Sequence, residues 1–185
     1  MLRLAGRTLV AGDTLQAADV IVVTADANGA GVLEAADLVH EGIASRVALF
    51  SDPPDEVDRE FIRRGLPYED AAERATRQLH ALGVSSVEQI PRAVAGTEDE
   101  GRVLPPWCDR QRLRSVVVVS TADHSRRLRR VMRRSMKGHD TSVTVRPTRY
   151  STFDPDRWWE TRAGIRLEIE ELEKLLLDVA RHPLG

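Results

Sequence analysis

The strongest constraint on the fold is a run of four valines in the segment Ser115–Ser120 (SVVVVS), which is followed by a basic helical pattern. A continuous apolar run of this kind is typical of a parallel strand that helices cover on both faces. The run ends in small polar residues and a histidine where the helix begins, as strands do at the ligand sites of open α/β sheets. The segment therefore predicts both a fold class and the place of a site.

Four other short runs fit the same fold. Apolar, β-branched segments predict strands over residues 19–24, 46–51, 87–90 and 143–145. Helical periods separate these strands, so the connections are expected to be crossovers between parallel strands. We expect an α/β, Rossmann-like three-layer sandwich with a mainly parallel sheet of about five strands.

The helices are predicted from apolar residues at helical spacing. One such face precedes Gly42, which is expected to cap the helix end. Because of the break at Pro105, Pro106 and Trp107, we expect residues 91–114 to form a helix followed by a surface loop.

A long C-terminal helix is predicted for about residues 156–181. Its glutamates are expected to point outward. Trp158 and Trp159 are expected to anchor it against the sheet edge. The apolar residues expected to point inward are Ile165, Ile169, Leu172, Leu175, Leu176 and Val179.

Length and composition narrow the class of protein. A chain of 185 residues is expected to form a single domain over residues 1–185. Since 27 basic residues nearly balance 29 acidic ones, the net charge of −2 gives no global argument for nucleic acid or an acidic membrane. The single cysteine, Cys108, cannot form an internal disulfide, so we expect a cytoplasmic location. Residues 1–12 are too short and interrupted to span a bilayer, so no membrane anchor is expected.

The candidate site lies where the loops after the first and fourth strands face each other, at the point where the strand order reverses. A helix that begins near Asp123 or His124 presents free backbone N–H groups, which favour an anionic group. His124 is the candidate catalytic residue, as general acid or base. The candidate ligand-binding residues are Thr24, Asp26, Asn28, Ser51, Thr97, Asp99, Ser120, Thr121, Asp123 and Arg127.

A structural interpretation of the same residues stays open. Asp123 is then only an N-cap and His124 a first-turn residue without a chemical role. The acidic run Glu98 to Glu100 is expected to be mostly solvated, with Asp99 as its candidate for the pocket, although such oxygens also suit Mg²⁺. We expect no metal site.

A basic cluster is the second prominent feature, because ten of the 27 basic residues lie between Arg110 and Lys137. No aromatic residues are interleaved along its helix for base stacking, and the apolar face of that helix is needed for packing. We therefore expect a solvated basic face and no nucleic-acid partner, with nucleic-acid binding as an alternative. The acidic residues expected to pair with it, within the domain or in a homo-oligomer, are Glu168, Glu170, Glu171 and Glu173.

Several segments carry a resemblance to a known family. The first strand with Asp19 is similar to an "aDxIVVLGG" motif, and residues 82–84 are similar to an "LGV" helix end. Residues 96–100 resemble an "NTxEN" element, and the segment from Ser120 to Arg127 resembles "SxxHxxR" through His124. A tryptophan-led final helix with Glu171 and Lys174 also matches. These motifs resemble those of the YdcF-like family, a domain-of-unknown-function group that includes SanA-like and ElyC-like envelope factors.

The resemblance implies a Rossmann-like sheet, a pocket at the carboxyl ends of its strands, binding of S-adenosylmethionine, and a role in envelope or peptidoglycan homeostasis. Two features depart from the family pattern. Residues 24–28 (TADAN) replace the family's glycine cluster, and both asparagines of the "NTxEN" element are missing. Side chains would therefore meet a ligand where the family offers bare backbone.

The leading hypothesis is a protein that binds a small anionic or nucleotide-like molecule where strands one and four end, with or without catalysis. The first alternative is a catalytically silent regulatory or interaction module. The sequence contains no P-loop, no GxSxG, no His/Cys metal spacing and no GxGxxG after the first strand. These absences argue against an ATPase, an α/β-hydrolase and a zinc enzyme of the common kinds.

Overall fold

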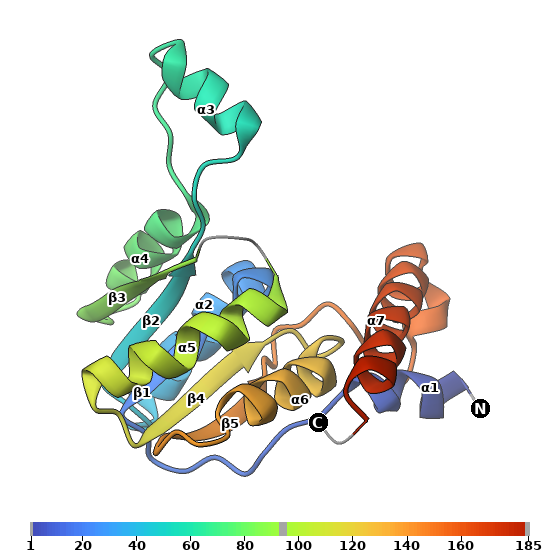
Figure 1. The fold of residues 1–185 in the computed structure, drawn as a ribbon. Helices are drawn as coiled ribbons and strands as arrows, with labels where there is room; N and C mark the ends of the chain where they lie inside the picture. Colours follow the sequence, from blue (N-terminus) through green and yellow to red (C-terminus); the bar gives the residue numbers. More distant parts are fainter. Residues whose placement is uncertain (1, 93–95, 184–185) are drawn as a thin grey trace.

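A parallel sheet forms the centre of the computed structural model, which describes residues 2–92 and 96–183 (Figure 1). The order of its strands is β3-β2-β1-β4-β5, and each neighbouring pair is parallel. The predicted α/β class and Rossmann-like sheet are confirmed. The order reverses between β1 and β4, where a crevice was expected. The strands are β1 (Val20–Val23), β2 (Arg46–Ser51), β3 (Ser86–Pro91), β4 (Ser115–Ser120) and β5 (Ser142–Pro147).

Helices cover both faces of this sheet, which explains the valine run in β4. Val116 and Val118 pack into the core cluster of α5 (Thr97–Gln111) and α6 (Ser125–Ser135). Alternate residues of a strand point to opposite faces, so Val117 and Val119 pack into the cluster on the other face. That second cluster belongs to α2 (Asn28–His40) and α4 (Ala71–Ala81). The helix α2 ends before Gly42, whose φ of 77° fits the predicted cap.

The prediction for residues 91–114 is wrong in its second half, because α5 continues through Pro105 and Pro106 to Gln111 instead of giving way to a loop. A proline inside a helix removes a backbone hydrogen bond. The burial of Trp107 and of its neighbours on the sheet-facing side of α5 offsets that loss. Residues 93–95 of the predicted segment lie outside the described residues.

The predicted C-terminal helix is α7 (Arg162–Arg181), but its predicted orientation is wrong. Ile169 and Leu176 are both 61% exposed, whereas Glu168, Glu171 and Asp178 are buried. The other apolar residues expected to point inward divide between two environments. Leu175 is buried and Leu172 is half-buried, whereas Ile165 and Val179 are exposed.

The arginines of α6 explain this orientation, because they face the acidic side of α7. Arg127 Nε lies 3.2 Å from Glu171 Oε2, and Arg130 Nε lies 2.6 Å from Asp178 Oδ2. Arg134 Nη1 lies 3.1 Å from the other oxygen of Asp178. The basic and acidic helices therefore pair within the chain, and much of the pairing is buried between them rather than solvated. Of the glutamates expected to take part, Glu171 contacts α6, whereas Glu170 contacts Lys174 of its own helix, and the other pairs go to Asp178.

The helix α1 (Leu2–Leu9) packs beside α7 (Figure 1). Trp158, in the short 3-10 helix η2 (Trp158–Glu160), donates its indole N–H to the carbonyl of Leu2 at 3.0 Å. It packs with Leu9 and Leu175 in a core cluster separate from the two clusters of the sheet. The tryptophan therefore joins α1 to α7, and the expectation that it anchors the helix at the sheet edge is wrong.

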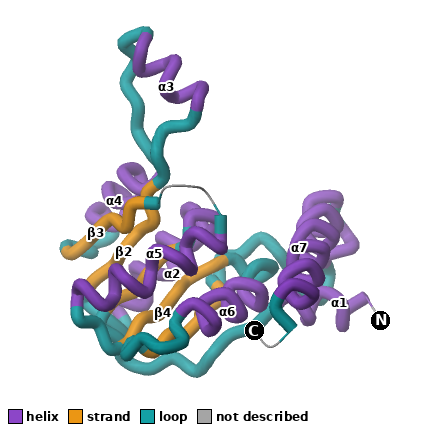
Figure 2. The backbone as a smooth tube through the Cα atoms, in the orientation of Figure 1, coloured by secondary structure: helices purple, strands orange, loops and turns teal. Residues whose placement is uncertain are grey.

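The helix α3 (Glu56–Arg63) stands away from the rest of the molecule on two loop segments (Figure 2). None of its residues is buried, and Val57, Phe61 and Ile62 are exposed. Asp55 closes a capping box with Asp58 at its first turn.

In the part of the chain that the structure describes, no helix is long and apolar enough to cross a membrane.

Two glycines of α2 give a matched test of its packing on β1. A Cβ atom at Gly31 would lie 2.6 Å from a methyl of Val23 and 2.5 Å from the Cβ of Ala27, whereas at Gly29 it would meet nothing within 4 Å. We expect Gly31→Ala to lower the free energy of unfolding by about 1–3 kcal/mol through overpacking. Gly29→Ala is expected to raise it by up to about 1 kcal/mol. Urea denaturation measures both, and stabilisation by both variants would contradict the close approach.

Candidate functional site

A cavity of about 500 Å³ opens at the carboxyl ends of β1 and β4. This is the crevice expected from the reversal of the strand order. Segments from the loop after β1, the start of α5, the loop after β4, and α7 contribute to it. The lining residues are Ala25, Asp26, Asp52, Arg92, Gly96, Thr97, Glu100, His124, Arg127, Glu171 and Lys174.

Four residues singled out from the sequence line this one cavity. Asp26 lies in the 3-10 helix η1 (Ala25–Ala27) after β1, and Thr97 is the first residue of α5. His124 directly precedes α6, and Arg127 lies on the first turn of that helix. The structure therefore brings together segments that are about 100 residues apart in the sequence. The chemical role of these residues remains a prediction.

Both nitrogens of the His124 ring have close neighbours, and the residue is only 4% exposed. The Nδ1 atom lies 3.2 Å from Glu171 Oε2 and 3.0 Å from Arg127 Nη2. The Nε2 atom lies 3.2 Å from the Thr97 hydroxyl. A carboxylate only accepts and a guanidinium only donates, so Glu171 favours a proton on Nδ1 while Arg127 competes against it. With the proton on Nδ1, Nε2 accepts from Thr97.

Glu171 is the residue of α7 that connects this histidine to the rest of the site. Burial by itself raises its pKa, but hydrogen bonds from His124 and Lys174 and the charge of Arg127 outweigh burial and lower the pKa to about 2. The carboxylate is thus held ionised and fully partnered. The sequence had marked Glu171 and Lys174 only through the family resemblance and the acidic pattern of the helix.

Glu100 and Arg92 are site residues that sequence reasoning missed. Glu100 was expected to be solvated, yet it is 2% exposed and accepts a hydrogen bond from the Ala25 backbone N–H at 3.0 Å. Burial raises the pKa of Glu100 to about 7, and the charge of Asp26 adds to this, against the Ala25 hydrogen bond and the charge of Arg92. Glu100 follows Thr97 by three residues, so both lie on one face of α5. The three-residue spacing places Glu100 beside Thr97 in the site, but this can be inferred only when α5 is known to begin at Thr97.

Asp99 does not line this cavity, although it was the acidic residue expected there. It is buried and not solvated, and its carboxylate bonds Arg102 one turn further along α5. Asp123 is not the N-cap of α6, because that position belongs to His124, which makes no side-chain capping bond. Asp123 is buried instead, and burial together with the nearby charge of Glu171 raises its pKa.

Other predicted site residues support the loops. The Thr24 hydroxyl donates to the Val119 carbonyl at 3.0 Å and thereby ties the ends of β1 and β4 together. Ser120 is fully buried and donates to the Thr121 carbonyl. Ser51 donates to the Asp70 carboxylate. Thr24, Ser51 and Ser120 therefore shape the crevice, but they do not line the cavity of about 500 Å³, which is called the first cavity below.

Two further predicted residues contact Asp26 directly. The Thr121 hydroxyl donates to Asp26 Oδ2 at 3.1 Å, across the gap between the loops after β4 and β1. The side-chain amide of Asn28 donates to the Asp26 backbone carbonyl at 2.9 Å. The backbone of Asn28 has a positive φ of 45°. The carboxylate and backbone of Asp26 are therefore both restrained.

A second cavity of about 480 Å³ adjoins the first and shares Ala25 and Asp52 with it. It lies over the ends of β1 and β2, and Thr24 and Asn28 are part of its lining. Its lining combines the aromatic residue Tyr68 and apolar residues with several carboxylates. Its other lining residues include Val23, Val32, Leu49, Phe50, Asp55, Asp58 and Asp70.

The comparison with known proteins identifies no family for this chain. No family model and no curated protein matches the sequence. Among solved structures, a universal stress protein in complex with cAMP is 20% identical, and the alignment covers 72% of this chain and 99% of that chain with a TM-score of 0.40. A similarity at this level carries no argument about function, so the interpretation of the site depends on its own residues.

Proposed function

We propose that this protein binds a small ligand with an anionic, nucleotide-like character at the carboxyl ends of β1 and β4. The observation that carries the proposal is the convergence of Asp26, Thr97, His124 and Arg127 in one cavity. Convergent polar groups in a concave site at the point of strand-order reversal are typical of ligand binding in this class of sheet.

The charges around the first cavity support an anionic group in the ligand. Arg92, Arg127 and Lys174 all line it, and guanidinium groups bind phosphate or carboxylate oxygens through paired donors. Arg92 is already paired with Asp52 at 2.6 Å, and Arg127 with Glu171. A bound anion therefore shares these cations with the protein's own carboxylates.

The second cavity supports the nucleotide-like size of the ligand. Val32 and Tyr68 in its lining suit a flat ring system, while Asp55 and Asp70 can accept hydrogen bonds from hydroxyl or amino groups. The two cavities share Ala25 and Asp52, so one molecule with a charged end and a ring end spans both.

In the catalytic version of this proposal His124 transfers a proton at Nε2, the ring nitrogen opposite the one that Glu171 contacts. In the silent version the same pocket binds the ligand without turnover and the protein acts as a regulatory module. The membership in the YdcF-like family, the binding of S-adenosylmethionine and the envelope role remain predictions from the resemblance.

The expectation against a nucleic-acid partner also remains a prediction, and the ion pairs of α6 support it. Arg129 and Arg133 pair with Asp13, while Arg130 and Arg134 pair with Asp178. These pairs neutralise much of the positive face. If the face nevertheless binds nucleic acid, the affinity will fall steeply with salt concentration.

The ligand proposal is tested by titrating the full chain with nucleoside phosphates, S-adenosylmethionine and inorganic phosphate in a chelating buffer. We expect at least one nucleotide-like compound to raise the melting temperature by several degrees. Calorimetry should show that His124→Ala and Arg127→Gln weaken its binding roughly tenfold or more, because charge-assisted hydrogen bonds are lost. Arg133→Ala, on the same helix but outside the cavity, should bind like the wild type. Equal binding by all four proteins would overturn the assignment.

A further inference from the structure

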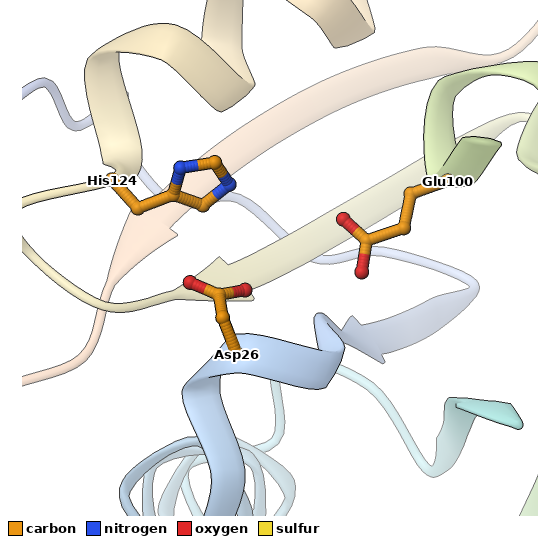
Figure 3. Close-up of side chains that lie close together, drawn as sticks. All are labelled: Asp26, Glu100 and His124. Carbon is orange, nitrogen blue, oxygen red and sulfur yellow. The ribbon is translucent and has the colours of Figure 1, made fainter. Parts of the chain in front are cut away.

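Three potential metal ligands from separate elements meet in the first cavity. A carboxylate oxygen of Asp26, a carboxylate oxygen of Glu100 and a ring nitrogen of His124 all lie within 4.8 Å of one another. Figure 3 shows the three side chains pointing toward a common space between η1, α5 and the start of α6. We propose that they form a binding site for a first-row divalent cation.

The spacing suits direct coordination. Three atoms at most 4.8 Å apart leave a central point at most about 2.8 Å from each, and small side-chain rotations shorten this to the ~2.1 Å of a metal–ligand bond. The three ligands come from the loop after β1, from α5 and from the loop after β4. The parallel sheet thus positions all of them without a local sequence motif, which explains why no metal site was expected from the sequence.

Each of the three side chains is also oriented by a further contact, as metal ligands usually are. Asp26 Oδ2 accepts from the Thr121 hydroxyl, and Glu100 Oε1 accepts from the Ala25 backbone N–H. His124 Nδ1 lies 3.2 Å from Glu171 Oε2. With the Nδ1 proton directed to that carboxylate, the Nε2 lone pair can bind a cation, which would replace the contact with Thr97 and, while bound, exclude the proton transfer at Nε2.

The charge around the cluster favours a cation as well. The carboxylate of Asp26, which is exposed, approaches that of Glu100, which is buried, and like charges at this distance repel. Arg92 compensates only in part, because its guanidinium pairs with Asp52 as well as with Glu100. A divalent cation between the two carboxylates removes this repulsion.

The ligand set indicates which cation fits. One imidazole nitrogen with two carboxylates suits Mn²⁺ or Zn²⁺ better than Ca²⁺, which takes oxygen ligands only. The three ligands line the cavity together with Arg127 and Lys174. An anionic oxygen of the ligand can complete the coordination there, and this last step rests on the function proposed above.

A second group of similar residues serves as an internal control. Glu98, Asp178 and His182 also offer ligand atoms within 4.8 Å of one another. Asp178 is already bonded to Arg130 and Arg134, and Glu98 is bonded to Arg134. A cation there would have to displace these arginines, so we expect it to bind in the first cavity.

The test uses the full chain, stripped with a chelator and then titrated with Mn²⁺ alone, with calorimetry and the Mn²⁺ electron paramagnetic resonance signal as readouts. We expect one site, weakened roughly tenfold or more by Asp26→Asn and by His124→Gln, and unchanged by His182→Gln. Circular dichroism of each metal-free variant checks that it is folded. Absence of Mn²⁺ binding, unchanged binding in both cavity variants, or loss of binding in His182→Gln would each overturn the proposal.

The outcome is separable from that of the ligand titration. Nucleotide binding in chelator without any Mn²⁺ binding overturns the cation site and leaves the proposed function standing. Mn²⁺ binding with no response to any ligand overturns the proposed function and leaves the cation site.

Discussion

Glu171→Ala is expected to lower the free energy of unfolding by about 3–5 kcal/mol, the effect typical of removing one partner from a buried ion pair. The carboxylate of Glu171 contacts His124, Arg127 and Lys174, and its removal leaves these donors without it at the junction of α6 and α7. Urea denaturation measures the change. Glu173→Ala, at an exposed position of the same helix, should stay within about 0.5 kcal/mol of the wild type.

The pH dependence of this effect follows from the lowered pKa of Glu171. The pKa is about 2 in the folded protein, against an ordinary value of 4.5. The stabilisation by Glu171 is therefore fully present above pH ~4.5 and is lost as the pH falls toward 2. A difference between wild type and Glu171→Ala that is as large at pH 3 as at pH 7 would contradict this account.

The second large effect is expected at Glu100, measured with a chelator present. Its pKa of about 7 lies above the ordinary 4.5, so the folded protein binds the proton more tightly than the unfolded chain. Stability should therefore fall by about 3 kcal/mol as the pH rises from 4.5 to 7. The charged or titratable groups that influence this carboxyl are Asp26, which raises its pKa, and Arg92 and His124, which lower it.

Substitution of the carboxyl isolates this contribution. Glu100→Gln should lose most of the fall in stability between pH 4.5 and 7, because an amide does not titrate in this range. Glu98→Gln is the matched control, since Glu98 lies on the same helix at an exposed position and should keep the wild-type slope. An unchanged slope in Glu100→Gln would show that another group causes the pH dependence.

The sheet was predictable because its strands are buried on both faces and therefore read as unbroken apolar runs. β2 and β4 have the predicted bounds, and the reversal of strand order between β1 and β4 lies where the loops after Thr24 and Ser120 were expected to face each other. The meeting of Asp26 with His124 follows from that topology alone.

Tertiary contacts determine the orientation of α7 and the burial of Glu100, and the sequence pattern predicted neither. The apolar pattern of α7 indicated an inward apolar face, but Arg127, Arg130 and Arg134 of α6 hold its acidic side inward. Glu100 looked like one of three solvated acids because its burial depends on the Ala25 backbone and on Arg92. Such long-range pairs leave no periodic signal in the sequence.

The ionic attachment of α7 has a consequence for the order in which parts of the protein open. Ion pairs to α6 and a small apolar cluster with α1 hold this helix, whereas the two large apolar clusters hold the sheet. We expect amide hydrogens of α7 to exchange with solvent sooner than those of β1 and β4, as in a separate cooperative unit of lower stability. Opening of α7 removes Glu171 from His124 while the strands stay paired. Any molecule that binds only the complete site will therefore slow exchange and proteolysis along α7 as well.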